Sequence, residues 1–147
     1  MRRGGHEEEL LFALSARGVY GLTAMVELAT RHESGPTQIR EIAEGHEIPQ
    51  HYLEQILVAL KKSGLVDSHR GAQGGYILAR QPGHIDVLEI LTVLEGPLEI
   101  APTPRKDDTL DFYWNDLDRR LREILSLSLE ELASRASSSK GRLTYVI

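Results

Sequence analysis

A glycine-rich stretch in the middle of the sequence, HRGAQGGYIL at residues 69–78, places an arginine beside three glycines. Such a stretch can bind a phosphate group through its backbone amides, or it can turn the chain in a hairpin. In a phosphate-binding loop, the last glycine is followed by Lys and then Ser or Thr, and a helix begins there. Here the alternating residues YILA follow, which is the pattern of a strand. The stretch therefore predicts a hairpin and excludes a nucleotide-binding enzyme built on this loop.

The polar side chains of this hairpin are suited to contacts with DNA. An arginine at a hairpin tip fits the narrow, electronegative minor groove, which makes Arg70 the strongest candidate of the chain. The alternative is a surface arginine that pairs with Asp67 or Glu54. Gln73, at the apex, is a candidate for a contact with phosphate or sugar.

A second set of polar residues lies on a helix that the sequence predicts within residues 49–64, just before the hairpin. Its early candidates are His51, Tyr52, Glu54 and Gln55. Glu54 can accept a hydrogen bond from the amino group of cytosine, and Gln55 can bind adenine or a phosphate. The alternative for Glu54 is a solvated helix charge. Tyr52 is expected to be partly in the core with its hydroxyl free for a phosphate. Three cations are candidates for phosphate contacts: Lys61 and Lys62 in the last turn of this helix, and Arg17 on an earlier one.

Two short helices must position these residues. The helix within residues 49–64 has an apolar face with helical spacing, formed by Leu53, Ile56, Leu57 and Leu60. A preceding short helix is predicted between Thr37, as its N-cap, and Gly45, as its end, with Ile39, Ile42 and Ala43 facing inward. Two short helices joined by a tight turn are typical of a helix-turn-helix, and a hairpin directly after it makes a winged helix.

Further helices flank this unit. The first is predicted from Ser15 to residues 34–36, with an apolar stripe of Leu22, Met25, Val26 and Ala29. Gly18 and Gly21 weaken its early turns, which indicates close packing or an irregular start. After the hairpin, Asp86 and Glu89 form a capping-box pattern for a helix that ends at residues 96–97. Residues 98–108 are expected to form a loop, and Ser128 with Glu131 predicts a last short helix.

A long helix at residues 110–125 carries apolar residues with heptad spacing. They are Leu110, Trp114, Leu117, Leu121 and Ile124. This 4, 3, 4, 3 spacing favours packing along a partner helix, although two heptads exclude a long coiled coil. The alternative is an ordinary core helix. Because the sequence predicts no other element for this face to cover, we favour a dimer interface.

Composition narrows the possible classes of protein. The 147 residues are 41% hydrophobic and 27% charged, which is ordinary for a protein with a packed core. No apolar run reaches the length of a membrane span, and no signal-peptide pattern follows the start, so we expect a cytoplasmic protein. The net charge is −5, with most of the acidity in the C-terminal half. Cysteine is absent, which excludes disulfides, thiolate metal sites and cysteine nucleophiles.

Six histidines raise the question of a metal site. His46, His51 and His69 could lie near one another at the polar face, but none has the spacing of a known site. The sequence also shows no activated nucleophile or paired catalytic carboxylates. We therefore expect neither a metal, nor a cofactor, nor an enzymatic activity.

The quoted elements together resemble a known family. The segments RGVYGLTAMVELA and IREIAEGHEIPQHYLEQILVALKKSGLVDSHRGAQGGYILAR are similar to the Rrf2 family of bacterial winged-helix transcription regulators, over residues 14–132. The resemblance implies a homodimer, held by the long C-terminal helix, that binds double-stranded DNA at an imperfect palindrome. It also implies that the start of the third helix, with His51, Tyr52, Glu54 and Gln55, enters the major groove. Arg70 would then reach the minor groove.

The sequence departs from the sensor members of that family at one place. Those members hold an iron–sulfur cluster with three cysteines in the loop before the long helix, and the loop here, LEIAPTPRKDDTL, has none. The chain resembles the clusterless branch, in which a partner enzyme regulates a repressor of cysteine metabolism. A regulatory protein or a small-molecule effector is therefore a possible partner.

The sequence thus predicts a mainly α fold with a small β-hairpin. Residues 1–12 are expected to be a disordered extension, 13–82 a winged helix-turn-helix, 83–136 a helical dimerisation region and 137–147 a tail. The predicted function is a dimeric regulator, a repressor, that binds a palindromic operator without a cluster. The alternative is a protein-interaction module whose acidic C-terminal half docks a metabolic enzyme, with weak or conditional DNA binding.

Overall fold

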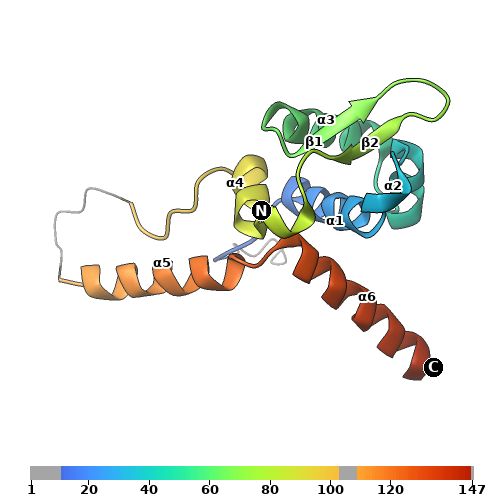
Figure 1. Ribbon diagram of the computed structural model, residues 1–147. Helices are drawn as coiled ribbons and strands as arrows, with labels where there is room; N and C mark the ends of the chain where they lie inside the picture. Colours follow the sequence, from blue (N-terminus) through green and yellow to red (C-terminus); the bar gives the residue numbers. More distant parts are fainter. Residues whose placement is uncertain (1–10, 103–108, 147) are drawn as a thin grey trace, which may run out of the picture.

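The computed structural model describes residues 11–102 and 109–146, with side chains up to residue 140 (Figure 1). Within these residues the chain is mostly helical and contains one two-stranded antiparallel sheet, which confirms the expected fold class. The helices are α1 (Ala16–Thr30), α2 (Ile39–His46), α3 (Gln50–Lys62), α4 (Val87–Glu95), α5 (Asp111–Leu125) and α6 (Leu129–Val146). The short 3₁₀ helices are η1 (His32–Ser34) and η2 (Pro82–His84), and the strands are β1 (Val66–His69) and β2 (Gly75–Leu78). The extension predicted at residues 1–12 lies almost wholly outside the described residues.

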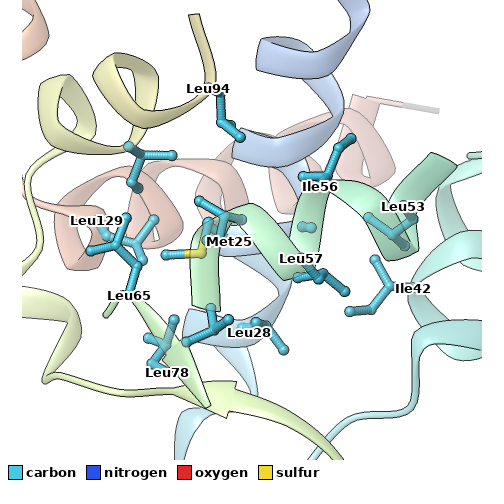
Figure 2. Close-up of a cluster of buried hydrophobic side chains, with 14 of the residues drawn as sticks. Met25, Leu28, Ile42, Leu53, Ile56, Leu57, Leu65, Leu78, Leu94 and Leu129 are labelled. Carbon is cyan, nitrogen blue, oxygen red and sulfur yellow. The ribbon is translucent and has the colours of Figure 1, made fainter. Parts of the chain in front are cut away.

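The core of the molecule forms where α1, α3 and α4 meet, and Figure 2 shows its side chains pointing toward one another. Helix α3 contributes its four predicted apolar residues, Leu53, Ile56, Leu57 and Leu60, and all four are fully buried. Each such side chain stabilises the fold by about 1.5–3 kcal/mol when it leaves water. Leu129 of α6 enters the same cluster, so the C-terminal helix is anchored to the winged-helix unit.

Helix α1 faces the core with a different side from the one that its apolar stripe predicts. Its buried residues are Gly18, Gly21, Ala24, Met25 and Leu28, whereas Leu22, Val26 and Ala29 are only half-buried. The reason is close packing: an added Cβ at Gly18 would collide with Glu95, and one at Gly21 with Leu94. The expectation of close packing at these two glycines is confirmed, because α4 lies directly against them. Helix α1 also ends at residue 30, before η1, and not at residues 34–36.

The prediction that Thr37 caps the second helix is wrong. Gln38 occupies the N-cap position, and Thr37 is buried and pairs with β2. The Thr37 N–H donates to the Tyr76 carbonyl at 2.9 Å, and the Tyr76 N–H donates to the Thr37 carbonyl at 2.8 Å. Helix α2 continues through Gly45 and ends when Glu47 adopts a left-handed conformation, with φ 55°.

The hairpin after α3 is the predicted wing. Strands β1 and β2 pair from Val66 with Leu78 to His69 with Gly75, and residues 70–74 form the turn. Position 75 requires glycine for two reasons. Its φ of 144° is one that other residues rarely adopt, and an added Cβ would collide with the Thr37 carbonyl. The backbone around Thr37 therefore approaches β2 closely at the point where β2 leaves the turn of the wing.

Two helices beyond the wing, α4 and α6, begin as their capping patterns predict. The Asp86 carboxylate accepts from the Leu88 N–H at 2.9 Å, and the Ser128 hydroxyl accepts from the Glu131 N–H at 3.0 Å. Helix α5 coincides with the predicted long helix. Helix α6 is longer than the short helix expected there and runs through most of the predicted tail, residues 137–147. Among the described residues, no helix is long and apolar enough to cross a membrane.

Candidate nucleic-acid interface

The solvent-facing side of α3 is a polar stripe. Its residues are His51, Glu54, Gln55, Val58, Lys61 and Lys62, and all six are exposed. The spacing of three and four residues places them on one side of the helix, because 3.6 residues complete a turn. The four leucine and isoleucine residues of α3 occupy the opposite, buried side. Core packing therefore determines which side chains this helix offers to a partner.

His51, Glu54 and Gln55 lie close together in the first two turns of α3. The Gln55 Nε2 donates to the His51 Nε2 at 3.3 Å, and the His51 Nδ1 lies 3.9 Å from the Glu54 Oε1. The His51 side chain is 85% exposed, so these surface contacts contribute little and exchange readily for contacts with a ligand. The cluster presents a carboxylate, an amide and an imidazole, which together can accept from and donate to base edges.

Tyr52 is placed between the core and the surface, as the sequence predicts. It is half-buried, and its ring packs edge-on against Tyr20 of α1, with the ring centroids 5.8 Å apart. Such a pair contributes about 0.5–1.5 kcal/mol beyond the burial of its area. The contact holds the start of α3 against α1, so it positions the neighbouring His51 and Glu54.

The end of α3 is joined to the wing. The Lys61 Nζ donates to the Ser68 Oγ of β1 at 2.6 Å, while Lys62 is exposed. Two ammonium groups therefore lie at the junction of the polar stripe and the hairpin, where they can contact phosphates on either side of a groove.

The tip of the wing presents Arg70 and Gln73, which are both exposed. Within the part of the chain that the structure describes, Arg70 forms no ion pair with Asp67 or Glu54 and no hydrogen bond. The turn is closed by its backbone, since the Gly74 N–H donates to the Gly71 carbonyl at 2.9 Å. The guanidinium is therefore free to enter a groove. Arg70 itself lies in a short turn that is closed by a backbone hydrogen bond.

Arg17 does not join this group. Its Nε donates to the Leu94 carbonyl at 3.1 Å, at the end of α4, and the side chain is half-buried. Figure 1 shows the first turn of α1 beside α4. The bond leaves the two terminal nitrogens of the guanidinium for other partners, and a phosphate contact by Arg17 stays a prediction.

Sequence reasoning missed Val58, which lies within the polar stripe and is 46% exposed. The signal was present in the spacing: Val58 follows Glu54 by four residues and Gln55 by three, which puts it on their side of the helix. The exposed Arg40 of α2 and Gln50 at the first turn of α3 were missed as well.

Among the described residues, the histidines do not form one metal site. The His46 Nε2 donates to the Glu27 Oε1 of α1 at 3.0 Å, and the Glu27 Oε2 accepts from the Arg31 Nε at 2.6 Å. Burial raises the pKa of Glu27, but the hydrogen bonds from His46 and Arg31 outweigh it and lower the pKa overall. His46 is thus bound to α1 and does not lie with His51 in the polar stripe of α3. In the described residues, no three His, Cys, Asp or Glu side chains are placed to hold a metal ion.

Helix α5 carries the expected apolar face, and its own subunit covers that face only in part. None of its residues is buried, and Leu110 and Ile124 are exposed. Leu117, Leu121 and Ile124 line an apolar groove of about 660 Å³ together with Leu91 of α4 and residues 12–14, 98 and 100. Trp114 instead packs edge-on against Tyr113, with the ring centroids 5.0 Å apart, and lines a separate hollow. The exposed Phe112 and Tyr113 add apolar surface that the heptad pattern did not predict.

Comparisons with known proteins match these features. The model of the Rrf2 family, described as iron-dependent transcriptional regulators, matches residues 14–135. The HTH-type transcriptional regulator CymR of Bacillus subtilis is 41% identical over 136 residues, which cover 91% of this chain and 99% of CymR. The HTH-type transcriptional regulator IscR of Xenorhabdus nematophila is 35% identical over 127 residues, which cover 81% of this chain and 77% of IscR.

Solved structures show the same likeness. The structure of Bacillus subtilis CymR superposes with a TM-score of 0.79 at 39% identity, covering 85% of this chain and 98% of that one. The structure of IscR from T. potens superposes with a TM-score of 0.72 at 36% identity, covering 92% and 93% of the two chains. With its winged helix and its exposed polar stripe, this chain belongs to the Rrf2 family of DNA-binding, helix-turn-helix transcriptional regulators.

Proposed function

We propose that the protein is a cytoplasmic repressor that binds a palindromic operator as a homodimer, without an iron–sulfur cluster. In this proposal, α3 enters the major groove with His51, Glu54 and Gln55 toward the base edges. Arg70 of the wing enters the adjacent minor groove. The observation that supports this most directly is the combination of the α3 polar stripe with Arg70, an exposed arginine at the tip of the wing for which the described residues provide no partner.

Contacts with phosphates supply the affinity. Lys61, Lys62 and Arg17 are the proposed cationic contacts, and the hydroxyl of Tyr52 and the amide of Gln73 are the proposed neutral ones. Six cationic contacts in a dimer correspond to a salt slope of about −5 in log K against log salt concentration. The net charge of −5 does not oppose this, because the acidic excess lies mainly after the wing.

Dimerisation through α5 follows from its unburied apolar face. A 15-residue helix with no fully buried residue gains little packing energy within its own subunit. A second copy that covers Leu110, Trp114, Leu117, Leu121 and Ile124 supplies the missing burial. The groove beside Leu117 and Leu121 supplies the receiving surface. Each of the two α3 helices of such a dimer then binds one half-site of the palindrome.

The described residues offer no fitting ligand set for the iron named in the family description. The sequence has no cysteine, and the described residues bring together no alternative set of three ligands. The signal is therefore proposed to be a regulatory protein or a small-molecule effector. The B. subtilis relative is described as the global cysteine regulator, and its near full-length match makes genes of cysteine metabolism the first regulon to examine.

Selection of bound sequences from random double-stranded DNA, with the purified dimer, tests the proposal. We expect enrichment of a palindrome and an affinity that falls steeply with salt. Failure to enrich any sequence, with and without cell extract, would overturn it in favour of the protein-interaction module.

A further inference from the structure

We propose that Val58 reads the 5-methyl group of a thymine in the major groove of each half-site. This inference rests on the proposed function, because it requires α3 to lie in that groove. It assigns to the operator a specific chemical feature, a methyl group at one base position.

The first support is the position of Val58. It is 46% exposed and lies in the middle of the α3 polar stripe, between Glu54 and Gln55 on one side and Lys61 and Lys62 on the other. Any DNA that these four residues contact must also pass over the valine. The side chain is therefore placed against the groove floor between the base-reading and the phosphate-binding ends of the stripe.

The second support is that the fold does not use this side chain. Helix α3 fills its place in the core with four fully buried leucine and isoleucine residues. Val58 is neither in the described core cluster nor among the half-buried residues that pack against it. A β-branched residue is also slightly unfavourable in a helix compared with Ala or Lys. Neither packing nor helix propensity accounts for a valine at this position.

The third support is chemical. Valine has no hydrogen-bonding group, so it cannot distinguish the donors and acceptors of base edges. In the major groove, thymine alone among the four bases carries a methyl group, and apolar side chains recognise it by contact. Glu54, Gln55 and Val58 then supply three different recognition chemistries on one helix side: an acceptor, an amide and an apolar surface.

Helix geometry locates the thymine. Val58 lies about 4.5 Å beyond Gln55 and about 6 Å beyond Glu54 along the helix axis, at 1.5 Å per residue. Successive base pairs are about 3.4 Å apart. We therefore expect the thymine one to two base pairs from the pair that Gln55 contacts, on the side toward Lys61 and Lys62.

The test compares thymine with uracil, which differs only by the missing methyl group. The palindrome selected from random DNA is resynthesised with uracil at each thymine of a half-site in turn, and binding is titrated by gel shift. One uracil position is expected to weaken binding by the wild-type protein about fourfold, the effect of one buried methyl group. The Val58→Ala variant is expected to bind the thymine and uracil forms equally, and Val58→Thr, which keeps one methyl group, to retain part of the preference.

Val19→Ala is the matched control, because Val19 is similarly exposed but lies on α1. This variant is expected to keep the wild-type preference for thymine, and circular dichroism confirms that each variant is folded. If a palindrome is selected but no uracil position weakens the wild-type protein, or Val58→Ala keeps the preference, the inference about Val58 fails alone. If no sequence is enriched, the proposed function fails as well.

Discussion

Arg80 and Glu89 form a two-point ion pair that joins the end of the wing to α4. The Arg80 Nη1 donates to the Glu89 Oε2 at 2.7 Å and the Nη2 to the Oε1 at 3.0 Å, while the Nη2 also donates to the His84 carbonyl at 2.6 Å. Arg80 follows β2, and α4 begins the region that leads to α5. This pair therefore connects the proposed DNA-reading unit to the proposed dimer unit across the predicted boundary at residues 82–83.

The Glu89→Gln variant tests this connection. The hydrogen bond from Arg80 lowers the pKa of Glu89, so its stabilising effect is present above the ordinary carboxyl pKa of about 4.3 and is lost as the pH falls through the lower folded value. Because both side chains are more than a third exposed, the loss at pH 7 is expected to be about 1 kcal/mol or less. Urea unfolding at pH 7 and at pH 3 measures it. Glu44→Gln, at an exposed carboxylate of α2, is the control, and an equal loss at both pH values would contradict the prediction.

A larger pH-dependent loss is expected for Glu27→Gln. The Glu27 side chain is only 17% exposed and accepts from both His46 and Arg31. Hydrogen bonds to charged groups contribute about 1.5–3 kcal/mol. Since the pKa of Glu27 is lowered, the destabilisation should be full near pH 7 and should shrink as the pH falls below about 4. Urea unfolding across this pH range measures the loss of stability in the Glu27→Gln variant. A loss of stability that grows toward acid pH would show that the carboxylate is not held in its charged form.

Arg70→Ala is expected to weaken binding to the selected operator by about 1–3 kcal/mol, the scale of one good base contact. Its stability should be unchanged, because the described residues give its side chain no partner. Arg135→Ala is the control for loss of one positive charge, since Arg135 is an exposed arginine of α6 that pairs with Glu131. Gel-shift titration of both variants on the same DNA distinguishes them. Equal affinities for the wild type and Arg70→Ala would remove Arg70 from the interface.

Two glycine variants are expected to have opposite effects on stability. Gly75→Ala should destabilise the protein by about 1–3 kcal/mol, because its φ is 144° and the new Cβ meets the Thr37 carbonyl. Gly45→Ala should stabilise it by about 0.5–1 kcal/mol, because Gly45 lies inside α2 with open space around it. Thermal unfolding of the two variants checks both signs. A Gly75→Ala protein as stable as the wild type would show that the start of β2 tolerates a wider spacing from Thr37.

Ile124→Glu tests the proposed α5 interface. Ile124 is 70% exposed, so the charged residue should not unfold the subunit, but it would place a charge in an apolar interface. Sedimentation or light scattering should find a monomer, and operator affinity should fall with the loss of the second half-site. Val58→Glu introduces the same charge at an exposed apolar position of α3 and should leave the dimer intact. A dimeric Ile124→Glu protein would exclude this part of α5 from the interface.

The spacing of residue types along the sequence was sufficient to predict much of the fold. The buried side of α3 and the extent of α5 follow from the spacing of apolar residues within one helix, and the capped start of α4 follows from the pair Asp86 and Glu89. The hairpin follows from glycines between two alternating segments. These features depend on residues that are neighbours in sequence, so the sequence alone can predict them.

Tertiary contacts determined the features that local spacing did not predict. Thr37 pairs with Tyr76 instead of capping a helix, Arg17 binds the end of α4, and α1 faces the core with its glycines because α4 needs that space. The same holds for the candidate interface, where helical spacing was enough to place Val58 on the polar side of α3, but only the fold joined the end of that helix to the wing through Lys61 and Ser68. The physical reason is common to all of these cases: each depends on a contact or a burial between segments far apart in the chain, and these energies arise only when the segments pack together.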